Sequence, residues 1–185
     1  MGKILLGLLI GVVVSFTAAL CYVRMGFVDP RADIEVGTLE TKLAMPALDR
    51  SVDRRAPSLK NPIQATDENL AAGMNIYQQN CAGCHGDIQH VHSPIGDSFY
   101  PRVPQFIDDA PDMSENQNYY ITKHGIRLSG MPACGKALNE RQIWQVTTFL
   151  SHIDKLPPQL SAAWKAVAGN SAVGYESDAG SKMEK

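Results

Sequence analysis

The residues best suited to chemistry are two cysteines and a histidine that stand close together, in the order Cys81-Ala82-Gly83-Cys84-His85. Two thiols with two residues between them can form thioether bonds to the two vinyl groups on one edge of a porphyrin. The imidazole that follows is then held beneath the iron as the proximal ligand. This pentapeptide predicts one haem c, attached covalently through Cys81 and Cys84.

A thioredoxin-like redox pair is one alternative use of two such cysteines. That motif is expected after a strand of a βαβ unit, whereas the residues before Cys81 predict a helix. Thr66 is a suitable N-cap, and two acidic residues follow it. Leu70, Met74 and Tyr77 then recur at helical spacing. The preceding helix therefore disfavours the redox pair.

A zinc site is the second alternative for Cys81 and Cys84. It needs two further ligands, which His90, His92 or Cys134 would have to supply. Haem is favoured because the pentapeptide is far more typical of haem attachment. On that interpretation His90 and His92 are solvent-exposed loop residues, with a second metal site as the alternative. Cys134 is then expected to be a buried free thiol, with an intermolecular disulfide or a redox role as the alternative.

A second axial ligand is expected on the far side of the iron. The histidines and methionines after His85 that could supply it are His90, His92, Met113, His124, Met131 and His152. Met131 is favoured because it stands in a loop rich in glycine and proline, not on a periodic apolar face. Glycines at 125, 130 and 135 let the backbone pass close to a flat macrocycle, and Pro132 stiffens the residue after the sulfur.

These motifs together resemble the class I c-type cytochromes, and among them the small membrane-anchored bacterial proteins with one haem. The resemblance implies an all-α fold with three to five helices around the haem, covering about Thr66 to Leu156. It also implies that Gly73 and Tyr77 cross a C-terminal helix at Asn139–Ile153. The matching segments are Gly73–Tyr77, Cys81–His85, Gly130–Pro132 and the aromatic residues of that last helix.

The resemblance suggests further site residues. In this family a proline carbonyl accepts a hydrogen bond from the second nitrogen of the proximal histidine, and such an acceptor fixes and enriches the ligand. Pro104 is the first choice for this role and Pro94 the second. Relatives often carry a tryptophan near a haem propionate shortly after the methionine. Cys134 occupies that neighbourhood here, so Arg127 or Tyr120 is expected to contact the propionate instead.

The N-terminal run from Ile4 to Val23 holds twenty residues without a charge. As a helix it would extend about 30 Å, the thickness of the hydrocarbon core of a bilayer. We therefore expect residues 1–24 to be a transmembrane anchor. A cleaved signal peptide is the alternative, with Thr17-Ala18-Ala19 as its small-residue site.

The rest of the chain divides into three further segments. Residues 25–65 predict a connector with an amphipathic helix at about 36–55, because Leu39, Leu43, Leu48 and Val52 form one apolar stripe. Pro46 is expected to kink or split that helix. Residues 66–157 form the predicted haem domain, and 158–185 a C-terminal extension whose tail is disordered from about 169.

Function follows from the expected ligands. An iron held by histidine on one face and methionine on the other has no open position, which predicts an electron carrier and not an enzyme. Because bacteria attach such haem outside the cytoplasm, the resemblance implies a haem domain on the periplasmic face of the inner membrane. The expected partners are membrane respiratory or dehydrogenase complexes.

Two other functions remain possible interpretations of the same residues. The first is a cytochrome subunit of a larger oxidoreductase, with the connector helix and the Trp164 segment as docking surfaces. The second is a haem gas sensor or peroxidase. A net charge of −2 disfavours nucleic acid as a partner.

Overall fold

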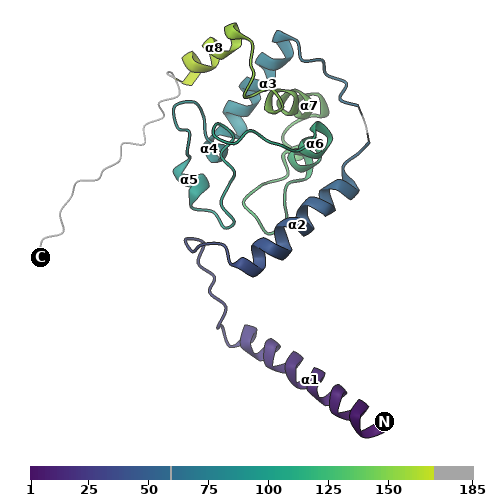
Figure 1. Cartoon of the computed structure of the whole chain (residues 1–185). Coiled ribbons are helices and arrows are strands. Elements are labelled where there is room, and N and C mark those ends of the chain that lie inside the picture. Colours follow the sequence, from purple (N-terminus) through teal and green to yellow (C-terminus); the bar gives the residue numbers. More distant parts are fainter. Residues whose placement is uncertain (59, 169–185) are drawn as a thin grey trace, which may run out of the picture. The chain divides into compact units, whose positions relative to one another are not determined.

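The computed structural model describes residues 1–58 and 60–168, and over these residues it consists of helices and connecting turns without a β-strand. The predicted all-α class is therefore confirmed. The chain divides into two compact units, one from Met1 to Ala32 and the other from Asp33 onward. Figure 1 shows the helices of each unit. The disordered tail predicted from about residue 169 lies outside the described residues.

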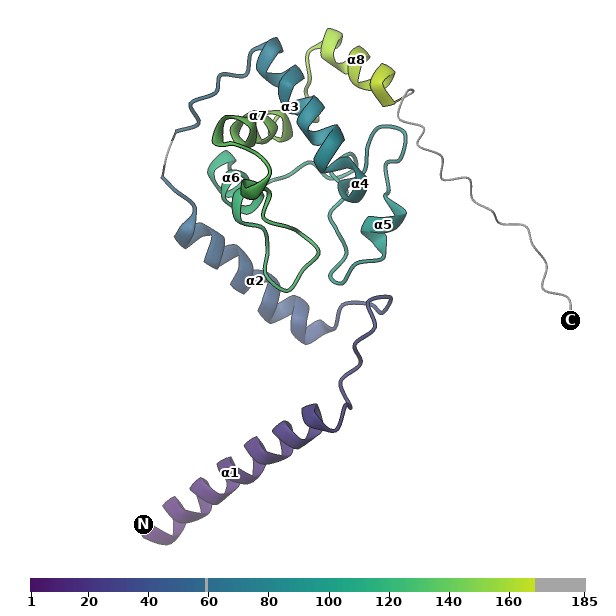
Figure 2. The same cartoon turned by 180° about the vertical axis from the view of Figure 1, so that it is seen from behind.

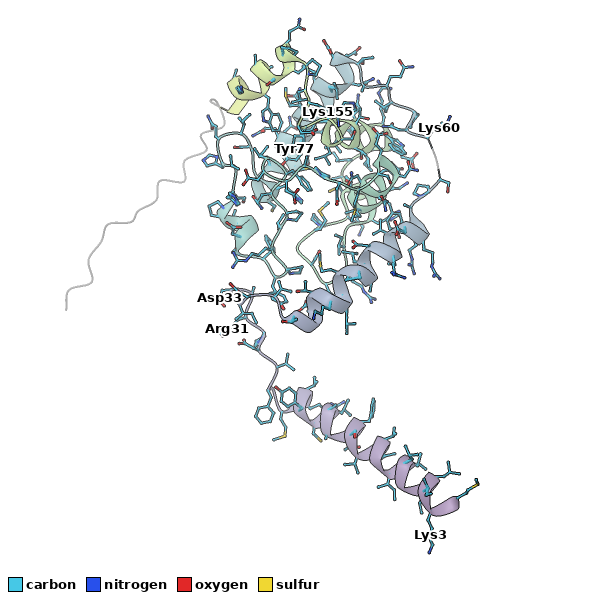
Figure 3. All side chains as sticks on the ribbon, in the orientation of Figure 1. Lys3, Arg31, Asp33, Lys60, Tyr77 and Lys155 are labelled. Carbon is cyan, nitrogen blue, oxygen red and sulfur yellow. The ribbon has the colours of Figure 1, made fainter. Side chains whose placement is uncertain are left out.

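Most of the first unit is the apolar helix α1 (Gly2–Arg24). It has 23 residues, a mean hydropathy of 2.6 over its most apolar stretch, and no buried side chain. At about 1.5 Å per residue it extends about 35 Å, enough to cross the hydrocarbon core of a bilayer. Lys3 marks its N-terminal end in Figure 3. Length and composition suit a membrane span, a property that α1 shares with signal sequences.

The core of the second unit is the crossing of α3 (Asp67–Asn80) with α7 (Glu140–Leu150), which is visible in Figure 2. Gly73 permits this close approach, because a Cβ atom there would lie only 2.2 Å from the carbonyl oxygen of Gln145. One turn further along α3, the buried ring of Tyr77 lies 5.5 Å from the ring of Phe149. The helix predicted at 139–153 is thus observed as α7 followed by a turn.

Side-chain caps determine where the longer helices of this unit begin. The hydroxyl of Thr66 accepts a hydrogen bond from the backbone of Asn69 at the start of α3, and the side chain of Asn139 accepts one from Gln142 at the start of α7. Such caps satisfy N–H groups that have no partner inside the helix. The sequence analysis did not anticipate the shorter helices as separate elements: α4 (Ala82–His85), α5 (Pro94–Asp97), α6 (Glu115–His124) and the 3-10 turn η1 (Cys134–Lys136).

The connector helix is present as α2 (Thr38–Arg55), within the same compact unit as α3 to α8. It continues through Pro46, so the expectation of a split helix is wrong. The apolar stripe packs only in part: Val52 is 3% exposed and Leu48 is half-buried, whereas Leu43 is 62% exposed. The C-terminal half of α2 therefore provides most of the apolar contact.

Polar contacts hold both ends of α2. Near its beginning, Glu40 accepts a hydrogen bond from the hydroxyl of Tyr100, in the segment after α5. Near its end, Asp53 accepts one from the side chain of Gln117 on α6. The helix thus connects two segments of the second unit that are far apart in the sequence.

The C-terminal extension contributes the helix α8 (Pro158–Ala168). Trp164 is only 4% exposed. Its ring lies 5.6 Å from the ring of Tyr77 and 4.9 Å from that of Phe149. The extension therefore completes the hydrophobic core on the side of α3, and the indole of Trp164 is not free to serve as a docking surface.

Candidate haem site

The pentapeptide lies where α3 ends, with Cys81 between α3 and the single-turn helix α4. The backbone N–H groups of Cys84 and His85 both donate to the carbonyl oxygen of Cys81, at 3.0 and 2.9 Å. Residues three and four positions apart in such a turn share a face, so both thiols and the imidazole lie on one side. Burial raises the pKa of Cys81 to about 12, with smaller contributions from the nearby Cys134 and from Cys84.

His85 is buried and oriented by a backbone carbonyl. Its Nδ1 lies 2.9 Å from the oxygen of Pro104, the proline that the sequence analysis put first. Pro94 instead forms the first turn of α5. Because a carbonyl only accepts, Nδ1 must carry the proton, which leaves the lone pair on Nε2. Burial lowers the pKa of His85 and so favours the neutral imidazole that a metal requires.

Two aromatic residues hold the histidine from other directions. The ring of Phe106 stacks on the imidazole at 4.3 Å, with 9° between the planes, and the backbone N–H of Phe106 donates to the carbonyl oxygen of His85 at 3.0 Å. The hydroxyl of Tyr77 donates to the carbonyl oxygens of Gly86 and His85, at 2.8 and 3.3 Å. Tyr77 was predicted only for the helix crossing, and Phe106 was not among the predicted site residues. An aromatic residue two positions after the favoured proline is the signal that could have found it.

Met131 stands in a loop that folds back on itself between α6 and η1. The backbone N–H of Ile126 donates to the Met131 carbonyl oxygen at 3.1 Å, and the N–H of Met131 donates to Oγ of Ser129 at 3.1 Å. Gly125, with φ +67°, packs so closely that a Cβ atom would lie 2.6 Å from the carbonyl carbon of Pro132. The backbone of this loop is thus fixed by its own contacts, and Met131 is half-buried at its end.

One contact links the methionine loop to the segment that carries Pro104. A Cβ atom on Gly130 would lie 2.5 Å from the ring of Phe99, in the segment that runs from α5 towards Pro104. Only glycine allows the two segments to meet at this distance. The structure therefore brings the loop of Met131 close to the chain that orients His85, although the two are distant in sequence.

The other predicted site residues lie around this arrangement. Arg127 is exposed, and the ring of Tyr120 lies 4.7 Å from that of His124. Within the described residues, no hydrogen bond joins either of them to the pentapeptide, so their contact with a propionate stays a prediction. Cys134 is half-buried, with Sγ 3.8 Å from the carbonyl oxygen of Pro132.

The residues present fit a covalently held haem better than the two alternatives. Within the described residues, no three His, Cys, Asp or Glu side chains are grouped as a metal site, which argues against zinc. Both His90 and His92 are exposed, each beside an aspartate. The element before Cys81 is α3, a helix, which argues against a thioredoxin-like pair. Two free thiols and a neutral imidazole on one turn form the donor set that haem attachment requires.

Comparison with known proteins leads to the same family. The family model described as "Cytochrome C oxidase, cbb3-type, subunit III" matches residues 68–150, from the first turn of α3 to the end of α7. The chain is also similar to a structure of the reducing HAO-like protein complex of Kuenenia stuttgartiensis, with 21% identity and a TM-score of 0.42. That similarity covers 51% of this chain and 48% of the other. Covalently bound haem c and electron transfer are properties of the matched family. Residues 68–150 thus match a cytochrome c domain, which supports a role in haem electron transfer.

Proposed function

We propose that this protein is a monohaem electron carrier, with haem c attached through Cys81 and Cys84 and the iron held by His85 and Met131. The haem supplies one-electron exchange between the ferrous and ferric states. Cys81 and Cys84 would hold it covalently, the Pro104 carbonyl would orient the imidazole of His85, and His85 and Met131 together would bind the iron, so that neither oxygen nor a substrate could bind it. A thioether ligand favours ferrous iron and raises the reduction potential relative to two histidines.

The observation that carries this proposal is the state of His85. It follows directly on the two thiols, burial lowers its pKa and so favours the neutral form, and its Nδ1 lies 2.9 Å from the Pro104 carbonyl oxygen. The remaining nitrogen is therefore free to bind a metal. A histidine that merely filled the core would not need this combination of tautomer and neighbours.

We also propose that α1 anchors the protein in the bacterial inner membrane as a single span. The N-terminus would then lie in the cytoplasm and the cytochrome domain in the periplasm, where haem of this type is attached. Membrane respiratory or dehydrogenase complexes are the partners that suit such a location.

The ligand assignment is tested on the full chain produced in a bacterium that matures c-type cytochromes. The spectrum of the denatured, reduced protein should show one covalently bound haem c. Met131→Ala should keep that haem, allow carbon monoxide to bind the reduced protein, and lower the potential, because the thioether is lost. Met113→Ala, a half-buried methionine before α6, is the matched control and should behave as the unaltered protein. An unchanged Met131→Ala spectrum would mean that another residue is the ligand.

A second candidate function is that of a cytochrome subunit within a larger oxidoreductase. The description of the matched family, which names an oxidase subunit, favours it. A subunit should co-purify from native membranes in fixed proportion with catalytic subunits, whereas a free carrier should separate from them in mild detergent.

A further inference from the structure

We infer that Gln105 is a positioning residue for His85: its side-chain amide holds the Pro104 carbonyl where that carbonyl can accept the Nδ1 proton. The inference rests on the proposed role of His85 as an axial ligand. It concerns a residue that no sequence motif singled out and that would not itself contact the iron.

The side-chain amide of Gln105 hydrogen-bonds to the backbone of three residues, namely Cys84, Val103 and Ser93. Nε2 donates to the carbonyl oxygen of Cys84 at 3.1 Å and to that of Val103 at 2.8 Å. Oε1 accepts from the N–H of Ser93 at 2.8 Å. The residue is only 8% exposed, and a buried amide with this many partners fixes the segments that it joins.

Pro104 makes few contacts that could fix the position of its carbonyl. It is exposed, and a proline has no N–H with which to join a hydrogen-bond network. Its position is set by its neighbours. Val103 is bonded to Gly96 through its N–H and to Gln105 through its carbonyl, and the N–H of Phe106 is bonded to His85. The side chain of Gln105 adds a hydrogen bond to the backbone of the haem-attachment turn, at Cys84.

These hydrogen bonds and the chain between them form a closed path that includes His85. His85 bonds to the carbonyl of Pro104, Pro104 is followed by Gln105, and the side chain of Gln105 bonds to Cys84, the residue before His85. A change in the distance between Pro104 and the imidazole must therefore stretch the bond between Gln105 and Cys84. In the proposed site a thioether bond would also attach Cys84 to the porphyrin. The hydrogen bonds of Gln105 would then fix the position of the Pro104 carbonyl relative to the haem.

Two glycines leave the space that the amide occupies. A Cβ atom on Gly96 would lie 2.8 Å from Nε2 of Gln105, and one on Gly86 would lie 3.2 Å from its Oε1. Gly86 also has φ +81°, a conformation that other residues rarely adopt. The local backbone is thus shaped around this side chain, which is packed between the haem-attachment turn and α5.

The expected consequence for the iron has a definite sign. A hydrogen bond from Nδ1 to a well-placed carbonyl makes the imidazole a stronger donor, which favours ferric iron. Loss of the Gln105 amide should let the Pro104 carbonyl drift, weaken that bond and favour the ferrous state. At a fixed ambient potential the ferrous-to-ferric ratio should rise at least about threefold, which corresponds to about +28 mV at 59 mV per tenfold change.

The experiment compares three variants of the full-length protein carrying its haem. Gln105→Leu removes all three hydrogen bonds at similar volume. Gln105→Glu keeps the acceptor for Ser93 but loses the amide donors. Gln89→Leu, at an exposed glutamine in the loop between α4 and α5, is the matched control. The readouts are the redox titration and the rate at which the Nδ1 proton of His85 exchanges with deuterium, followed by NMR.

The inference is supported if Gln105→Leu and Gln105→Glu raise the ferrous fraction and speed the exchange about tenfold, while Gln89→Leu does neither. It is overturned if the Gln105 variants lose stability but keep the wild-type potential and exchange rate, because the role is then merely structural. Should the leucine variant fail to mature, the glutamate variant decides by the same criteria. Absence of covalent haem in the unaltered protein would instead refute the proposed function.

Discussion

At the residue scale, the site is organised by what surrounds His85. The three consecutive residues Pro104, Gln105 and Phe106 provide a carbonyl to its Nδ1, an amide to the backbone of Cys84, and an aromatic ring against its imidazole. Tyr77 approaches from α3 and donates to the backbone of the same turn. The imidazole of His85 is therefore fixed in position, tautomer and ring orientation by the surrounding protein.

Tyr77 offers a direct test of this support. Burial raises its pKa, so its hydroxyl remains a hydrogen-bond donor at all physiological pH values. Tyr77→Phe keeps the packing against Phe149 and Trp164 but leaves buried carbonyl oxygens without that donor, at a cost of about 1–3 kcal/mol. Guanidinium unfolding of the haem-loaded protein should show this loss. Tyr119→Phe, whose hydroxyl accepts a hydrogen bond from the side chain of Lys123, should cost clearly less; equal losses would contradict the assignment.

At the element scale, the cytochrome domain extends beyond the residues that the family model matches. α8 follows that region, and its Trp164 packs against both helices of the central crossing. Tyr77, on which Trp164 packs, in turn holds the backbone of His85. α8 therefore stabilises the site indirectly, through the core.

Replacement of this indole should be costly. Trp164→Ala removes a large side chain from a closed core and is expected to lower the free energy of unfolding by about 3–5 kcal/mol. Thermal or denaturant unfolding, monitored by the haem absorbance, measures the change. Lys165→Ala, on the exposed face of the same helix, should alter stability by less than about 0.5 kcal/mol. A tolerated Trp164→Ala would indicate that α8 is only loosely attached.

Features that depend on residues close together in the sequence could be predicted from it. Contacts that depend on the path of a loop could not. The haem-attachment motif, the capped helix before it and the glycine at the crossing are local signals. The contacts of Gln105 and Phe106 depend on how the chain returns from α5, which no periodicity encodes. In α2 the spacing indicated an apolar stripe, yet only tertiary contact determines that Val52 packs and Leu43 does not. Pro46 is tolerated because the carbonyl of exposed Lys42, which loses its partner, can bond to water.

At the scale of the whole molecule, the proposed anchor α1 and the cytochrome domain lie in separate compact units. Replacing residues 1–24 with a cleavable signal peptide should release the protein into the soluble periplasmic fraction. Its haem content and reduction potential should not change, because α1 contributes no buried residue. Cell fractionation and redox titration check both expectations. Retention of the shortened protein on membranes would show that a partner complex, not α1, holds it there.

Because α2 belongs to the cytochrome unit, only the residues from Met25 to Gly37 separate it from α1. With α1 in the lipid, the redox centre would search for its partners by lateral diffusion along one leaflet. Turnover should then follow how densely the donor and acceptor complexes populate that surface, and dilution of the surrounding aqueous compartment should leave it unaffected.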